Sequence, residues 1–132
     1  MQKLEHIGIA VKDLAKANTL FAKLLGKEHY KIEEVEIEGV KTSFFEIHGV
    51  KIELLEASRE DSPIAKFIEK RGEGLHHLAF EVDDINESIK YYQQKGFEPI
   101  RTEPSKGADN KLVSFLHPKT AQGVLVELCQ EM

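Results

Sequence analysis

The chain opens on the stretch Leu4-Glu5-His6-Ile7-Gly8-Ile9-Ala10-Val11, and a similar stretch begins its second half, Leu75-His76-His77-Leu78-Ala79-Phe80-Glu81-Val82. In both stretches a histidine opens an apolar run, and an acidic residue and a helical pattern follow. The two halves also end alike, on Lys51-Ile52-Glu53-Leu54-Leu55 and on Leu125-Val126-Glu127-Leu128-Cys129. Self-similarity of this kind indicates a structural repeat.

Each half predicts one helix followed by three strands. Apolar residues at helical spacing predict helices over residues 13–25 and 84–95, with Asp13 and Asp84 suited to the N-cap and Gly26 and Gly96 ending them. Alternating patterns between turn residues predict the strands 29–36, 41–47, 51–56, 97–102, 111–117 and 124–129. A helix beginning at Asp61-Ser62-Pro63 and ending near Gly72 joins the halves.

The predicted fold class is therefore α+β, with two tandem βαβββ units forming a curved mixed sheet. The repeats span residues 1–57 and 74–132. A unit of about 60 residues buries little core by itself. We therefore expect residues 1–132 to form a single domain.

Composition limits the classes of protein to which the chain can belong. Apolar residues make up 41% and charged residues 31%, as in ordinary globular proteins, and no apolar run approaches the roughly 20 residues that span a bilayer. Neither a signal peptide nor a membrane partner is predicted, and a cytoplasmic location fits best. A single cysteine, Cys129, excludes an internal disulfide framework and a cysteine-based zinc site. The net charge of −5, without a dense basic patch, argues against binding to nucleic acid.

Four residues at matched places in the repeat predict a metal site. If the halves share a fold, His6 and His77 lie on the first strand of each half, and Glu53 and Glu127 on the last. Two imidazole nitrogens and two carboxylates suit a divalent cation of Co, Mn, Ni, Fe or Zn. A lone histidine or glutamate is more often an ordinary hydrogen-bonded residue, and a duplicated scaffold can keep such residues without metal. Their recurrence at matched positions is what favours ligation.

Strand register selects between the adjacent histidines of the second half. Side chains alternate along a strand, so neighbouring residues face opposite ways. Alignment of the halves equates His77 with His6 and His76 with Glu5. We therefore expect His77 to face the site, and Glu5 and His76 to lie on the other face.

The paired halves resemble the vicinal-oxygen-chelate, or glyoxalase-like, superfamily, and within it the family of methylmalonyl-CoA epimerases, over nearly the whole chain. The more particular segments are Asp61-Ser62-Pro63-Ile64-Ala65 and His117-Pro118-Lys119, the latter with Gly123-Val124-Leu125-Val126-Glu127-Leu128. The resemblance implies one divalent cation, an acyl-CoA substrate and a homodimer. The family's metal ligands fall on the four residues named above, although the family often has glutamine where this chain has Glu53.

The reaction implied is proton removal at C2 of methylmalonyl-CoA, through an enolate that a chelating cation stabilises, and proton return on the opposite face. Glu127 is the first candidate base and Glu53 a candidate partner. Some members of the family carry a second glutamate base where this chain has Thr42, whose hydroxyl is a poor base at neutral pH. The identity of the second proton carrier therefore stays open.

Four basic or imidazole side chains are candidates for binding the substrate's phosphates or carboxylate: Lys106, Lys111, His117 and Lys119. Lysines are more often solvated surface charge.

Three other functions are alternatives to the epimerase interpretation. Glyoxalase I uses nearly the same ligands, but it more often shows an Asp-Pro-type turn where this chain has His117-Pro118-Lys119. An extradiol dioxygenase typically keeps two histidines and one carboxylate around iron. A metal-free binding module would not need all four ligand residues.

Overall fold

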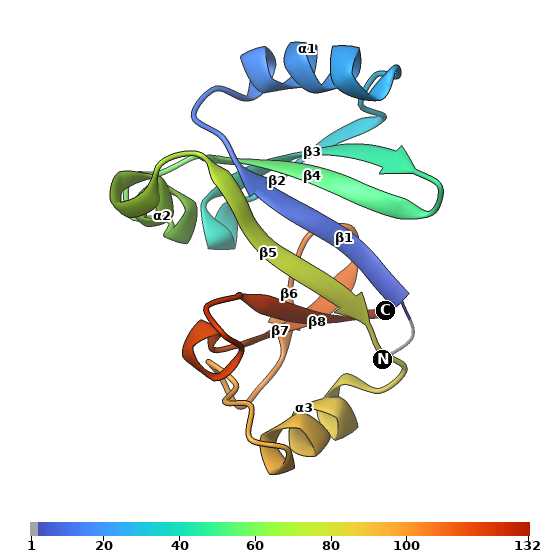
Figure 1. Cartoon of the computed structure of the whole chain (residues 1–132), viewed down its shortest axis with the longest axis vertical. Helices are drawn as coiled ribbons and strands as arrows, with labels where there is room; N and C mark the ends of the chain where they lie inside the picture. The colour runs from blue at the N-terminus through green and yellow to red at the C-terminus, as the bar shows by residue number, and fades with distance from the viewer. Residues whose placement is uncertain (1–2) are drawn as a thin grey trace. The chain divides into compact units, whose positions relative to one another are not determined.

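Two βαβββ repeats joined by a helix form the chain in this computed structural model, which describes residues 3–132 (Figure 1). The first repeat contains β1 (Lys3–Ala10), α1 (Leu14–Leu25), β2 (Lys31–Val35), β3 (Val40–Ile47) and β4 (Val50–Ala57). The second contains β5 (Gly74–Glu81), α3 (Ile85–Gln94), β6 (Ser105–Lys106), β7 (Lys111–Leu116) and β8 (Val126–Glu131). The helix α2 (Pro63–Arg71) lies between the repeats in the chain. Short 3₁₀ turns follow β2 and β7, and they are η1 (Glu36–Glu38) and η2 (Pro118–Thr120). The predicted α+β class is confirmed.

The sheet is mixed. Its strands are hydrogen-bonded in the order β2-β3-β4-β1-β5-β8-β7-β6. β5 pairs with β8 in parallel, whereas β2–β3, β3–β4, β6–β7 and β7–β8 are antiparallel. A parallel pair between first and last strands of one repeat requires a crossover, which α3 and the hairpin strands supply.

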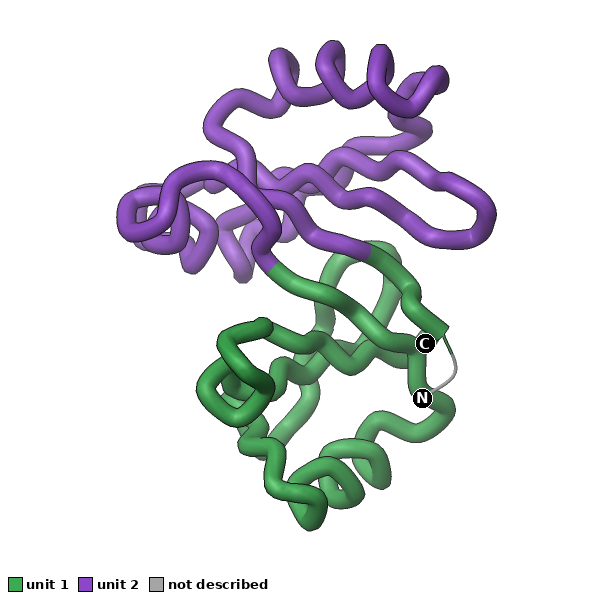
Figure 2. The backbone as a smooth tube through the Cα atoms, in the orientation of Figure 1, with its two compact units in different colours: residues 1–6, 77–132 green, residues 7–76 purple. Residues whose placement is uncertain are grey.

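The chain divides into two compact units that do not coincide with the repeats (Figure 2). Unit 2 comprises Ile7–His76, and unit 1 comprises the residues up to His6 together with His77–Met132. The first residues of β1 therefore belong with the second repeat. That both units form a single domain stays a prediction.

The predicted caps fix where the helices begin. Asp13 accepts a hydrogen bond from the backbone N–H of Lys16, and Asp84 accepts one from Glu87, each at 3.1 Å. Each carboxylate thus satisfies a backbone donor that the first helical turn leaves free. Ser62 caps α2 in the same way.

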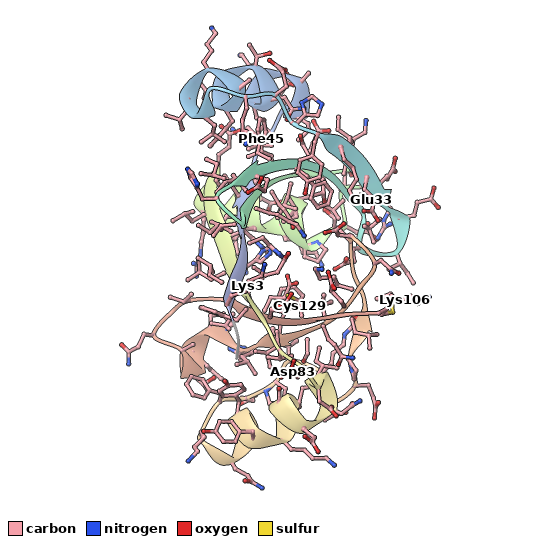
Figure 3. The ribbon with its side chains drawn as sticks, turned by 90° about the vertical axis from the view of Figure 1, so that its right-hand side faces the viewer. Lys3, Glu33, Phe45, Asp83, Lys106 and Cys129 are labelled. Carbon is pink, nitrogen blue, oxygen red and sulfur yellow. The ribbon has the colours of Figure 1, made fainter. Side chains whose placement is uncertain are left out.

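Each unit has its own apolar core. In unit 2, α1 packs on one face of the strands over Phe45 and Leu54, and Figure 3 shows Phe45 on the side that faces the helix. Leu55, the next residue of β4, points to the other face and packs with Ile64 of α2. In unit 1, α3 packs over a cluster of Val82, Ile85, Ile89, Leu116 and Leu128. Residues that alternate with Leu128 on β8 consequently face away from α3.

Of the strands predicted for the second repeat, one does not form and another begins at a different residue. Residues 97–102 form no strand and instead make an isolated bridge between Pro99 and Leu116. Proline has no N–H to give to a ladder, so pairing cannot extend through it. The last strand begins at Val126 rather than Val124, because Val124 donates to Ala121 in a turn that contains Gly123 at φ 88°.

Among residues 3–132, the structure contains no helix that is both long and apolar enough to cross a bilayer.

Gly39 provides a test of the packing in unit 2. Its φ is +64°, and a Cβ at this position would lie 2.9 Å from both Arg59 Cζ and Ser62 Cβ. Gly26 has a similar φ of +74° but open space around it. We expect Gly39→Ala to lower the free energy of unfolding by about 1–3 kcal/mol more than Gly26→Ala, because only the former adds a steric clash to the backbone strain. Urea denaturation of both variants measures the difference, and equal losses would contradict the close approach.

Candidate metal centre

Three side chains of unit 1 converge on one point. His6 on β1, His77 on β5 and Glu127 on β8 are 5%, 7% and 5% exposed. The Nε2 atoms of His6 and His77 lie 3.0 Å apart. Glu127 Oε1 lies 3.1 Å from His77 Nε2 and 3.5 Å from His6 Nε2. The three ligand atoms thus form a nearly equilateral triangle within the interior of the unit.

Strand register explains how β5 and β8 bring two of these residues together. Ala79 of β5 lies opposite Glu127 of β8, and His77 is two residues before Ala79, on the same face. Ala79 is fully buried and has no side-chain atoms beyond Cβ, so it leaves room for the Glu127 carboxylate to reach His77. His76 instead packs its ring 4.8 Å from the ring of Phe67, in unit 2. The two adjacent histidines are separated as strand alternation predicts.

The triangle has the dimensions of a cation site. A cation held about 2.0–2.2 Å from each ligand atom, in tetrahedral or octahedral geometry, has neighbouring ligand atoms about 2.8–3.6 Å apart. The distances among His6, His77 and Glu127 fall in this interval. Two imidazole nitrogens and one carboxylate are also the donors that first-row divalent metals prefer. The residues present therefore fit a metal ion.

Glu127 is held in its charged form. Burial by itself raises the pKa of this carboxyl, but the neighbouring imidazoles of His6 and His77 outweigh burial and lower the pKa from 4.5 to about 2. At neutral pH the carboxylate is therefore ionised, which is the state that ligation or proton acceptance requires.

The fourth predicted ligand, Glu53, lies in unit 2. It sits on β4, opposite Phe44 of β3, and is 5% exposed. Its side chain shares a strand face with Leu55, away from α1. A buried glutamate at this position is consistent with a polar role, but its place beside the other three residues stays a prediction.

Thr42 lies on the same side of the strands as Glu53, since it pairs with Leu55 across β3 and β4. It is 1% exposed, and its hydroxyl has no hydrogen-bond partner among the described residues. A buried hydroxyl without a partner is costly and is often explained by a ligand or water.

The prediction from strand alternation was wrong for the side chain of Glu5. We expected it on the face opposite His6, yet its Oε1 lies 2.6 Å from His6 Nδ1. The expectation was wrong for the carboxylate because a glutamate side chain is long enough to bend back to its neighbour's ring. Glu5 is 2% exposed. An acidic residue next to a ligand-type histidine, in an otherwise apolar strand, was the signal available in the sequence.

The four candidate substrate-binding residues have different surroundings. Lys106 and Lys119 are exposed, and Figure 3 shows Lys106 at the edge of the molecule. His117 caps η2, where its Nδ1 accepts a hydrogen bond from the N–H of Lys119 at 3.2 Å. Lys111 is 4% exposed, with its Nζ 3.4 Å from Glu131 Oε1 and 4.0 Å from Glu5 Oε2. Only two of the three lysines therefore present a charge to solvent.

Comparisons with known proteins identify the family of the chain. Residues 5–115 match a family described as the Glyoxalase/Bleomycin resistance protein/Dioxygenase superfamily. The ethylmalonyl-CoA/methylmalonyl-CoA epimerase of Cereibacter sphaeroides is 40% identical over 97% of this chain and 97% of its own. The human mitochondrial methylmalonyl-CoA epimerase is also 40% identical, over 97% of this chain and 73% of its own.

A solved structure extends the similarity to three dimensions. A variant of the Streptomyces coelicolor methylmalonyl-CoA epimerase, in complex with 2-nitronate-propionyl-CoA, superposes with a TM-score of 0.94 at 34% identity. The match covers 99% of this chain and 95% of that protein.

Cys129 allows a test of how closed this side of unit 1 is. It lies on β8 two residues after Glu127, is fully buried, and its Sγ is 3.5 Å from the carbonyl oxygen of Phe80 (Figure 3). Burial, followed by the charges of Glu127 and Glu5, raises the pKa of the thiol far above its usual range. We expect iodoacetamide to leave Cys129 unmodified in the native protein at pH 8 and to alkylate it fully in urea, because the thiolate is the reactive form. Mass spectrometry measures both, and rapid native alkylation would contradict a closed interior.

Proposed function

Because the chain belongs to the Glyoxalase/Bleomycin resistance protein/Dioxygenase superfamily, and within it to the family of methylmalonyl-CoA epimerases, we propose that it inverts C2 of methylmalonyl-CoA with the help of one divalent cation. The observation that carries the proposal is the buried triangle of His6, His77 and Glu127 in a chain that matches epimerases over its full length.

His6, His77 and Glu127 would hold the cation, and Glu53 would be the fourth protein ligand. Bound there, a divalent cation supplies electrostatic stabilisation for negative charge that develops on the thioester carbonyl oxygen. The triangle supports three of these assignments by its dimensions, and the matched position of Glu53 in the repeat supports the fourth. The ion is Co, Mn, Ni, Fe or Zn, since this donor set suits each of them.

Glu127 would remove the C2 proton. Its carboxylate is buried and ionised, so it can accept a proton without first losing one. The low pKa has a cost, since a weakly basic carboxylate is a weak proton acceptor. The two neighbouring imidazoles produce that low value, and substrate binding that weakens their interaction with Glu127 would make the carboxylate more basic.

Inversion requires a second proton carrier on the opposite face of C2. Glu53 is the protein group we propose for this role, because it is buried and acidic. Thr42 offers a hydroxyl that has no partner within residues 3–132, and this hydroxyl can donate a hydrogen bond to the substrate but cannot act as a base near neutral pH.

The CoA moiety would meet the basic residues at the end of β6 and in η2, which follows β7. Lys106 and Lys119 carry exposed charges suited to phosphate groups, and His117 orders the turn that holds Lys119. That the related Streptomyces enzyme was solved with an acyl-CoA analogue supports an acyl-CoA substrate here. The homodimer and the cytoplasmic location stay predictions.

Solvent exchange tests the reaction. With Co²⁺ and methylmalonyl-CoA in D₂O, we expect deuterium to enter C2, and Glu127→Gln to slow its entry by about a hundredfold or more, the usual contribution of a general base. Mass spectrometry of the recovered thioester measures the uptake. Glu131→Gln, on the same strand but exposed, serves as the matched control and should exchange at the wild-type rate.

Absence of deuterium from C2 would refute the epimerase proposal. Turnover of methylglyoxal with glutathione in its place would instead indicate glyoxalase I.

Metal binding is tested independently of the substrate. We expect His6→Ala and His77→Ala each to abolish stoichiometric Co²⁺ binding in calorimetry, because either change leaves too few protein ligands. His48→Asn is the control, since His48 is exposed and its positive φ of 47° is one that asparagine tolerates. Undiminished binding by both alanine variants would place the metal elsewhere.

A further inference from the structure

We propose that Glu5 is a positioning residue that fixes the ring of His6, with Lys111 as the buried counter-charge of its carboxylate. The inference rests on the proposed function in one respect, namely that the atom being positioned, His6 Nε2, is a metal ligand.

The contact between Glu5 and His6 is short and protected from water. Glu5 Oε1 lies 2.6 Å from His6 Nδ1, and the two side chains are 3% and 6% exposed. A hydrogen bond to an ionised acceptor is shorter and stronger than one between neutral groups. Because both residues are on β1 and adjacent, this bond ties the imidazole to its own strand.

This bond determines which nitrogen of His6 carries the proton. A carboxylate can only accept, so Nδ1 must be the donor, and in the neutral imidazole Nε2 is then left with a lone pair. That nitrogen is the one lying 3.0 Å from His77 Nε2 and 3.5 Å from Glu127 Oε1. Glu5 therefore presents His6 in the tautomer that a cation requires, before any cation arrives.

Lys111 explains how a carboxylate can be kept at this depth. Its side chain is 4% exposed, and its Nζ lies 4.0 Å from Glu5 Oε2 and 3.4 Å from Glu131 Oε1. A buried charge is stable only if it is paired, and Lys111 would itself be costly without Glu5. Glu131 is 76% exposed, so it touches the pair from the solvent side only. The buried position of Lys111 suits a counter-charge for Glu5 better than it suits the phosphate-binding role predicted from the sequence.

The second histidine has different ring neighbours. His77 packs edge-on against Phe115, with ring centroids 5.8 Å apart, and the residue before it, His76, packs against Phe67. The repeat therefore supports its two histidines differently, and the carboxylate contact belongs to the first.

The experiment measures the tautomer of His6 and the affinity for Co²⁺ separately. In the metal-free protein, nitrogen–proton correlation spectra of the imidazole should show His6 protonated at Nδ1, and in Glu5→Ala they should show the Nε2–H form or a mixture. Co²⁺ affinity should fall about 10–100-fold in Glu5→Ala, the usual effect of losing such a contact. Glu5→Gln, whose amide oxygen can still accept from Nδ1, should retain the tautomer and lose less affinity. Glu131→Gln is the control and should match the wild type in both measurements.

The outcomes separate the two proposals. An unchanged His6 tautomer with unchanged Co²⁺ affinity in Glu5→Ala would overturn the role of Glu5. If Glu5→Ala does not fold, an Nε2-protonated His6 in the wild type or in Glu5→Gln would overturn it equally. Wild-type protein that binds no Co²⁺ would refute the metal centre, whereas the tautomer measurement decides the role of Glu5 by itself.

Discussion

The structure of unit 1 depends on one constraint, which is that three buried polar atoms must lie about 3 Å apart among apolar strands. Burying two imidazoles and a carboxylate is unfavourable unless each finds a partner. The parallel register of β5 and β8 meets this constraint by setting Glu127 opposite the small Ala79, two residues from His77. A shift by one residue would turn either side chain to the α3 face and dismantle the triangle.

The polar groups around this triangle are arranged in successive contacts from the interior to the solvent. Glu5 accepts from His6, Lys111 lies beside Glu5, and Glu131 meets Lys111 at the surface. The two buried members, Glu5 and Lys111, stabilise each other, whereas Glu131 contacts Lys111 from the solvent side only. Burial first, and then the negative charges of Glu127 and Glu5, raise the pKa of the Cys129 thiol, because ionisation would add a third negative charge in the same interior.

Sequence reasoning reached the features that local chemistry determines. Asp13 and Asp84 were predicted as caps because an N-terminal helical turn needs an acceptor wherever it occurs. The convergence of His6, His77 and Glu127 followed from the repeat, since equal folds place equal positions alike. The predictions that failed concerned features that depend on pairing between distant strands or on the conformation of a long side chain. Pro99 interrupts a pattern that otherwise alternates like a strand, and the return of Glu5 to its neighbour's ring depends on a rotamer that no periodicity records.

The assignment of the start of β1 to the unit of the second repeat has an evolutionary consequence. Neither repeat contains all three residues of the triangle, so a single ancestral repeat would have built it only as a pair of identical chains that exchanged a strand. Two halves joined in one chain are free to differ at matched positions. The position before each histidine differs in this way, since Glu5 contacts His6 whereas its counterpart His76 packs against Phe67. Two histidines at matched places in the repeat thus have different surroundings, one bonded to the carboxylate beside it in the chain and the other packed edge-on against Phe115.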